Sequence, residues 1–330
     1  MAEIVLGIGA SHTPLLTFGA DKWPDYSKRD YKSKTLNLSD GRWVSYEELA
    51  AERGERYAAV ATAEEFARKQ RLCQEALDHI AEDIADAAPD VVIVVTDDHY
   101  ELFSPSNNPA ISIYYGKDIL TWTAPPREGS DAWFSDMVET YAMDRTHSFP
   151  GMPDFAYELI ERLVGKNFDI GVSNTVEDPA KAGFGHGIGF IVHRLFKGRS
   201  IPVIPVLLNT YYPPNAPRPA RCVALGQALR QAIEESPSPL KVAVVASGGL
   251  SHFTVDEGLD RGIVDALIAG DTEALANVPT EALNSGSSEI RNWLVLGGAI
   301  AGRPNRWVEY QPLYRTPAGT GIGVGFGVWG

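Results

Sequence analysis

Cysteine is scarce in this chain, and long apolar runs are absent. The two cysteines, Cys73 and Cys222, do not have the spacing of a metal motif and are typical of small buried side chains in a reducing compartment. No stretch approaches the roughly 20 consecutive apolar residues that a membrane-spanning helix needs. Glu3 precedes only a short apolar run, so we expect no signal peptide, no membrane association and a cytoplasmic location.

Basic residues are also in deficit. The chain contains 29 lysines and arginines against 43 acidic residues, a net charge of −14. Because a nucleic-acid-binding face needs clustered positive charge, we exclude nucleic acid as the main partner. We find no internal repeat, low-complexity segment or linker, and we therefore expect one domain over residues 1–330. The sequence does not fix the oligomeric state, and a homo-oligomer is compatible with it.

The clearest element is the run Val91–Val95, which is followed at once by Asp97, Asp98 and His99. Five consecutive β-branched residues are typical of a strand that is buried on both faces of a parallel sheet. Other apolar runs alternate with segments of helical periodicity along the whole chain. We predict an α/β fold, with a central, mostly parallel sheet flanked by helices and interrupted by loop insertions.

Four histidines lie at predicted strand ends or in glycine-rich loops: His12, His99, His186 and His252. A single histidine is more often a hydrogen-bonded structural residue than a ligand. The carboxyl ends of parallel strands, however, meet at one edge of a sheet, where ligands bind. Four histidines in such positions therefore predict a shared site.

Two kinds of metal site fit these residue types. Two imidazoles and a carboxylate form the open ligand set of non-haem iron(II) oxygenases, and a zinc hydrolase also accepts two histidines and a glutamate. Asp97, Asp98, Asp256 and Glu257 are all candidates for the carboxylate on chemistry alone. Glu257 also has a simpler explanation, because acids in the first turn of a helix interact favourably with its dipole.

Four motifs, in this order along the chain, resemble one enzyme family. They are Gly9-Ala10-Ser11-His12-Thr13-Pro14, Asp97-Asp98-His99, Gly185-His186-Gly187 and Ser247-Gly248-Gly249-Leu250-Ser251-His252. Together they are similar to the class III extradiol ring-cleavage dioxygenases, the superfamily of the protocatechuate 4,5-dioxygenase β-subunit. The segments Tyr211–Pro214 and Tyr314–Gly321 resemble its methylgallate and gallate dioxygenase branch.

The resemblance implies a ligand set and a catalytic residue. His12 and His99 match the iron(II) ligands of the family, and His186 matches its catalytic histidine. The third ligand in the family is a glutamate downstream of the Ser-His motif, and Glu257 is the nearest match. The family often has an acid where this chain has Gly258, so Glu257 matches only if the alignment slips by one residue.

Further residues are candidates for supporting roles. His252 is expected near the site without touching the metal, bonded either to backbone carbonyls or to a ligand. Asp98, Tyr212 and Ser285 are candidates for contacts with the substrate or with the ligands. The glycines around His186 are expected to let the backbone approach a ligand closely, although they also suit a tight turn before a helix.

The function that the resemblance implies is iron(II)-dependent extradiol cleavage of a catecholic acid by dioxygen, with a 3-O-methylgallate-, gallate- or protocatechuate-like substrate. A small aromatic molecule and dioxygen are then the partners, and a histidine that titrates near neutrality can take and return a catechol proton. Two alternatives remain open: a non-catalytic metal-binding or signalling member of the same superfamily, and a zinc-dependent relative.

Overall fold

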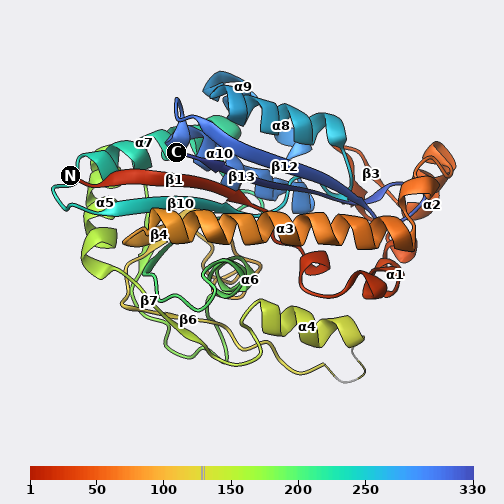
Figure 1. Ribbon diagram of the computed structural model, residues 1–330, viewed down its shortest axis with the longest axis horizontal. Coiled ribbons are helices and arrows are strands. Elements are labelled where there is room, and N and C mark those ends of the chain that lie inside the picture. The colour runs from red at the N-terminus through yellow and green to blue at the C-terminus, as the bar shows by residue number, and fades with distance from the viewer. Residues whose placement is uncertain (128, 130) are drawn as a thin grey trace.

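The computed structural model describes residues 1–127, 129 and 131–330. A nine-stranded sheet forms its centre, in the order β11-β13-β1-β10-β4-β9-β5-β8, with β12 paired to β13 (Figure 1). The strands of this sheet are β1 (Glu3–Ala10), β4 (Val91–Asp97), β5 (Ile111–Tyr114), β8 (Gly171–Ser173), β9 (Val203–Leu208), β10 (Lys241–Ser247), β11 (His252–Thr254), β12 (Asn305–Tyr314) and β13 (Thr320–Trp329). Two small antiparallel pairs lie outside it, β2 (Leu36–Asn37) with β3 (Trp43–Val44) and β6 (Asp118–Leu120) with β7 (Ser148–Pro150).

The middle of the sheet is parallel, as predicted. Strands β1, β10, β4 and β9 run in one direction, whereas β5 is antiparallel to β9, and β13 is antiparallel to β1. The glycine-rich tail forms the hairpin of β12 and β13. The fold class is therefore confirmed, with antiparallel strands extending both edges of the parallel centre.

Strand β4 is buried on both faces, as its composition predicts. All seven of its residues are buried. Val91, Ile93 and Val95 pack into the apolar cluster on one face of the sheet, while Val92 and Val94 pack into the cluster on the other. This alternation follows from the two-residue period of a strand, in which successive side chains point to opposite faces of the sheet.

Helices cover both faces of the sheet. The long helix α3 runs along the strands, and α4 and α6 lie on the same side, whereas α5, α7, α8 and α10 pack against the other face (Figure 1). The helices are α1 (Trp23–Ser27), α2 (Tyr46–Arg53), α3 (Ala63–Ala87), α4 (Ala132–Thr140), α5 (Pro153–Gly165), α6 (His186–Phe190), α7 (Pro219–Glu234), α8 (Glu257–Ala269), α9 (Thr272–Ala276) and α10 (Ile290–Ile300).

Helices α3 and α10 illustrate two kinds of burial. Thr62 caps α3 by accepting a hydrogen bond from the backbone of Glu65, and an apolar stripe then faces the sheet over 25 residues. Every residue of α10 is buried, because α7 covers the side that faces away from the sheet. Within the part of the chain that the structure describes, no helix is long and apolar enough to cross a membrane.

The register of the parallel strands brings their carboxyl ends together. Ala10 at the end of β1 pairs with Ser247 at the end of β10, and Val95 near the end of β4 pairs with Ala246. The loops that follow these three strands therefore leave the sheet side by side, which places the histidine-bearing motifs at one edge.

Candidate active site

A cavity of about 390 Å³ lies at this edge of the sheet. The four histidines that the sequence singled out all line it: His12, His99, His186 and His252. The ring centroid of His186 lies 4.7 Å from that of His12 and 4.6 Å from that of His99. The predicted convergence of the strand-end histidines is thus present in the structure.

Ser247 fixes the protonation pattern of His12. The Ser247 hydroxyl donates to the carbonyl oxygen of Gly187 at 2.9 Å, so it accepts a hydrogen bond from Nδ1–H of His12 at 2.8 Å. The other ring nitrogen, Nε2, therefore carries the lone pair of the neutral imidazole. Burial first, and then the neighbouring charge of His186, keep the pKa of His12 well below its ordinary value.

The Nε2 atom of His12 is buried and has no hydrogen-bond partner among the described residues. Its nearest carboxylate is that of Glu289, whose Oε2 lies 3.6 Å away. A buried nitrogen lone pair without a hydrogen-bond donor costs free energy of folding, unless it binds a ligand such as a metal ion.

His99 is held by Asp97. Oδ2 of Asp97 lies 2.9 Å from Nε2 of His99, and Oδ1 accepts a hydrogen bond from Nδ2 of Asn292 at 3.2 Å. Burial opposes charge on both residues, but their ion pair outweighs it, lowering the pKa of Asp97 and raising that of His99. Asp97 therefore orients His99, in the way that carboxylates commonly orient metal-ligating histidines.

Besides Asp97, a second carboxylate lies with these histidines, that of Glu289, which the sequence reasoning missed. Glu289 directly precedes α10 and is 3% exposed. Its Oε2 accepts the backbone N–H of Gly249 at 2.7 Å. Burial and then the charge of Asp97 raise the pKa of Glu289 well above its usual range, and a cation in the cavity would relieve this strain.

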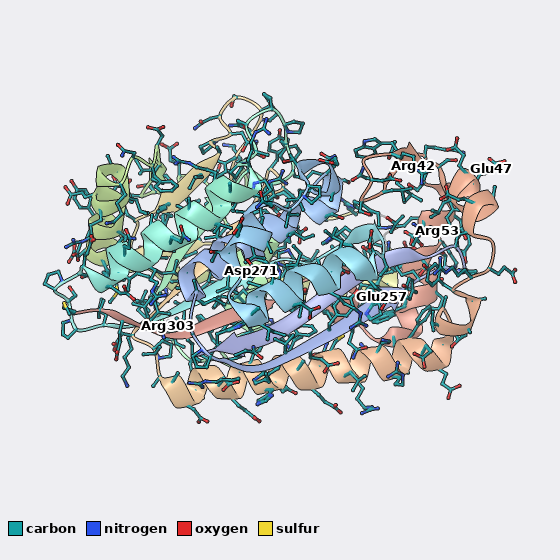
Figure 2. All side chains as sticks on the ribbon, turned by 90° about the horizontal axis from the view of Figure 1, so that it is seen from above. Arg42, Glu47, Arg53, Glu257, Asp271 and Arg303 are labelled. Carbon is teal, nitrogen blue, oxygen red and sulfur yellow. The ribbon has the colours of Figure 1, made fainter. Side chains whose placement is uncertain are left out.

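Glu257, expected as the third ligand, does not lie in this cluster. It is the first residue of α8, and Figure 2 labels it on the outer helix near Arg53. Its side chain is 39% exposed, and its carboxylate accepts a hydrogen bond from the Tyr314 hydroxyl at 2.8 Å and pairs with Arg261 at 3.1 Å. Favourable interaction of a first-turn acid with the helix dipole accounts for this position. Asp256 is the N-cap of the same helix and accepts the backbone N–H of Leu259.

His186 is paired with Glu101. Nδ1–H of His186 donates to Oε1 of Glu101 at 2.5 Å, and the second carboxylate oxygen accepts the backbone N–H of His99 at 2.7 Å. Burial alone would lower the pKa of His186, but the Glu101 carboxylate outweighs it and raises the pKa to about 9. The protein by itself therefore favours the protonated imidazolium, where the sequence suggested a group that titrates near neutrality.

The glycines around His186 serve packing within the chain. A Cβ at Gly185 would lie 2.3 Å from the Glu101 carboxyl carbon, and one at Gly187 would lie 2.1 Å from Oγ1 of Thr96. These contacts agree with the second expectation, close packing at the start of a helix, because Gly185 is the N-cap of α6, and the approach of a ligand stays a prediction. They let α6 sit against β4, so that His186 and Glu101 can meet.

Tyr141 completes this part of the wall. Its ring centroid lies 5.6 Å from that of His186, and its buried hydroxyl has no hydrogen-bond partner in the described part of the chain. Burial raises the pKa of Tyr141 well above its ordinary value, so the phenol stays protonated. It is a neutral donor beside His186.

His252 lies where the sequence placed it, in the cavity wall beside the carboxylate. Its Nδ1–H donates to the carbonyl oxygen of Leu250 at 2.8 Å, and its Nε2 lies 3.4 Å from Oε1 of Glu289. Burial lowers the pKa of His252 to about 4, so the ring is neutral. Both roles that the sequence left open, a bond to backbone and support of a ligand, are compatible with these contacts.

The remaining candidates, Asp98, Tyr212 and Ser285, are not among the described residues that line the cavity. Asp98 accepts the backbone N–H groups of Tyr100, Leu102 and Phe103 and so orders the turn after β4. Tyr212 stacks on Tyr100, with ring centroids 3.6 Å apart, and is not among the described residues that line the cavity.

Tyr211 takes the place in the wall that the sequence reasoning gave to its neighbour Tyr212. The Tyr211 ring packs 4.8 Å from that of His99. Ser285 lines an adjacent cavity and reaches the Tyr211 hydroxyl at 3.4 Å. Ser285 therefore reaches His99 only through Tyr211.

Comparison with known proteins identifies the family. Residues 58–326 match the family described as "Catalytic LigB subunit of aromatic ring-opening dioxygenase". The chain belongs to this LigB family. His99, His186 and Glu289 lie within the matched range, and His12 precedes it.

Two relatives are similar over parts of their length. A gallate dioxygenase of Pseudomonas putida is 34% identical over 132 residues, which covers 37% of this chain and 38% of the relative. A 2,3-dihydroxyphenylpropionate/2,3-dihydroxicinnamic acid 1,2-dioxygenase of Comamonas testosteroni is 32% identical over 99 residues, covering 30% of this chain and 29% of the relative. Each alignment thus spans well under half of the relative.

The residues of this LigB-family chain fit a divalent metal ion. Ligand atoms of Asp97, His99 and Glu289 lie within 4.8 Å of one another, as do those of His12, Asp97 and His186. Metal–ligand bonds of about 2.0–2.2 Å put neighbouring donor atoms about 3 Å apart, close to the 3.6 Å between His12 and Glu289. The unpartnered Nε2 of His12 is the observation that most favours a metal here.

Proposed function

We propose that this chain is an iron(II)-dependent extradiol dioxygenase that opens the ring of a catecholic acid and incorporates both atoms of dioxygen. In this proposal His12, His99 and Glu289 hold the iron, and His186 is the acid–base group.

The single observation that carries the proposal is the lone pair of His12. Ser247 holds the proton on Nδ1, so Nε2 faces the Glu289 carboxylate as an unprotonated, unpartnered nitrogen. Two histidines and one carboxylate with open positions form the ligand set of non-haem iron(II) oxygenases. We choose Glu289 over Asp97 as the third ligand because Oε2 of Glu289 faces the unpartnered Nε2 of His12, whereas Oδ2 of Asp97 lies beside Nε2 of His99 at 2.9 Å.

We assign proton handling to His186. Its ring lies between those of His12 and His99, within reach of a hydroxyl bound beside them. Glu101 stabilises the imidazolium, so His186 can hold the proton that a catechol hydroxyl releases and later return it. A cation on the neighbouring ligands would repel the imidazolium and bring its pKa back towards neutrality.

Other wall residues favour an anionic substrate oxygen in the same place. When bound, iron(II) supplies the one-electron chemistry with dioxygen that amino-acid side chains lack. The Tyr141 hydroxyl, held neutral by burial, can donate a hydrogen bond to a substrate oxygen next to His186. The low exposure of His12, Glu101 and Glu289 limits water around that oxygen.

The test is anaerobic loading with iron(II), removal of unbound metal, and oxygen-uptake measurements over gallate, 3-O-methylgallate, protocatechuate and catechol. The proposal predicts stoichiometric uptake, with one dioxygen consumed per ring opened. Zinc-loaded protein is the control and should consume no dioxygen. Metal binding without oxygen uptake for any catechol would contradict the proposal and favour a non-catalytic metal-binding protein.

A further inference from the structure

Two arginines line the cavity that contains the histidines, Arg29 and Arg127. The Arg29 guanidinium lies over the Tyr26 ring, 4.0 Å from its centroid, and donates from Nη2 to the Tyr26 hydroxyl at 2.7 Å. Arg127 lies 4.9 Å from the centroid of the Phe134 ring. Within residues 1–127, 129 and 131–330, neither guanidinium forms an ion pair with a carboxylate.

A third arginine in the same wall has a different environment. Arg315 is buried, and its Nε and Nη2 donate to the Asp30 carboxylate at 2.7 and 3.2 Å. Its charge is therefore balanced inside the protein. Arg29 and Arg127 are the positive groups of the cavity that remain available to a bound anion.

Arg29 lines the same cavity as the proposed metal ligands His12, His99 and Glu289. Tyr211, whose ring packs against His99, is the link between them. Arg29, Tyr211 and His99 all line the one cavity. A ring bound beside His99 thus lies within the field of Arg29.

We propose that Arg29, assisted by Arg127, binds the carboxylate of an aromatic acid whose hydroxyl groups face the histidines, and that it makes the site selective for anionic catechols over neutral ones. This assignment rests on the proposed function, because it needs a ring-bound substrate in the cavity. It concerns a residue from the loop around α1, far from the histidine motifs in sequence.

The chemistry of Arg29 suits this role. A guanidinium has five N–H donors, and the contact with Tyr26 engages one nitrogen, which leaves other donors for a planar carboxylate. The Tyr26 ring limits the positions of the guanidinium and so reduces the entropy lost on binding. A protein with a net charge of −14 repels anions in general, so a local positive group is needed to hold an acid.

The first test compares two substrates that differ in charge. Arg29→Gln should raise the KM for protocatechuate about tenfold or more, as expected for loss of a charge-assisted hydrogen bond at a solvent-accessible position, and should leave the KM for 4-methylcatechol unchanged. The control is Arg56→Gln, because Arg56 is also exposed and lies over a tyrosine ring, Tyr57, but lines another cavity. An equal rise for both catechols would overturn the assignment.

The second test needs no turnover. Calorimetric titration of the protein without added iron should detect 4-hydroxybenzoate, with affinity about tenfold weaker in Arg29→Gln and unchanged in Arg56→Gln. Unchanged affinity in Arg29→Gln would overturn the assignment. If the wild type consumes no dioxygen with any catechol, yet Arg29→Gln loses 4-hydroxybenzoate binding, the proposed function fails and Arg29 remains an anion-binding residue.

Discussion

Ser247 and His12 form the contact on which the proposed metal site depends. The Ser247 hydroxyl gives its proton to the Gly187 carbonyl and accepts one from Nδ1 of His12. These two hydrogen bonds connect the end of β10, the start of α6 and the loop after β1. It directs the nitrogen lone pair of His12 into the cavity, where the Glu289 carboxylate lies 3.6 Å away.

Removing the Ser247 hydroxyl should weaken metal binding without removing a ligand. In Ser247→Ala the proton of His12 can move to Nε2, so iron(II) affinity should fall about 10–100-fold. The measurement is competition with a chromogenic chelator. Ser236→Ala is a suitable control, because Ser236 is equally buried but its hydroxyl donates to Glu158. Equal affinities for Ser247→Ala and the wild type would show that this hydroxyl does not set the tautomer.

Replacing His186 should separate binding from chemistry. His186→Phe should retain iron at the wild-type stoichiometry, while oxygen uptake under saturating substrate falls about 10²–10⁴-fold with the loss of acid–base help. His147→Phe is the comparison, because His147 pairs with Asp144 away from the cavity. Loss of iron in His186→Phe would make His186 a ligand, and normal turnover would remove it from the mechanism.

The pair of Glu101 and His186 predicts a pH-dependent contribution to stability in the metal-free protein. The pKa of His186 rises from 6.5 to about 9, which corresponds to roughly 3 kcal/mol at about 1.4 kcal/mol per unit. Because the folded state binds this proton more tightly, the contribution is fully present below pH 6.5 and is lost as pH rises through about 9.

Glu101→Gln removes the partner that raises this pKa. The difference in unfolding free energy between wild type and Glu101→Gln should therefore be larger at pH 6 than at pH 10, as measured by urea unfolding. Glu64→Gln, an exposed acid on α3, provides the control and should give the same difference at both pH values. A difference for Glu101→Gln that does not change with pH would contradict the assigned ion pair.

Tyr141 should affect turnover more than stability. Because its buried hydroxyl has no partner in the described part of the chain, Tyr141→Phe should leave the unfolding free energy unchanged or raise it by about 1 kcal/mol. Turnover should fall about 10–100-fold if the hydroxyl donates to an anionic substrate oxygen. Urea unfolding and oxygen uptake on the same preparation give both numbers. A destabilisation of about 2 kcal/mol or more would instead indicate a structural hydrogen bond.

The sequence predicted the parts of the site that follow local rules. The run Val91–Val95 indicated a doubly buried strand, and the position of His99 just beyond it followed directly. His12 likewise lies just beyond the end of β1. Because both strands flank β10 in a parallel arrangement, their ends meet, which is a topological rule that needs no knowledge of side-chain contacts.

The carboxylate could not be located in the same way. Glu289 reaches the cavity from the far side, through the packing of α10 against β10 and β4, and nothing local marks this long-range contact. Glu257 was expected because it follows the Ser-His motif closely, but its helix carries it to the surface. The sequence does show that Glu289, Arg291 and Asn292 are polar residues at the start of a helix that is otherwise apolar, but it does not show which of them enters the cavity.

The position of Glu101 could be predicted from the sequence only in part. It follows His99 by two residues, so its presence near the site was foreseeable, but its pairing with His186 depends on the absence of a side chain at Gly185. The pattern of glycines by itself suits both the close approach of a ligand and a tight turn before a helix. Their role in packing α6 against β4 became apparent only from the three-dimensional contacts.

The measurement that tests the central claim most directly is iron retention by two matched variants, Glu289→Gln and Glu257→Gln. Each is loaded with iron(II) anaerobically, desalted and assayed for bound metal, with circular dichroism to verify the fold. The proposed site predicts that Glu257→Gln keeps iron at the wild-type stoichiometry and that Glu289→Gln loses it. Retention of iron by folded Glu289→Gln, together with its loss from Glu257→Gln, would contradict the proposed ligand set.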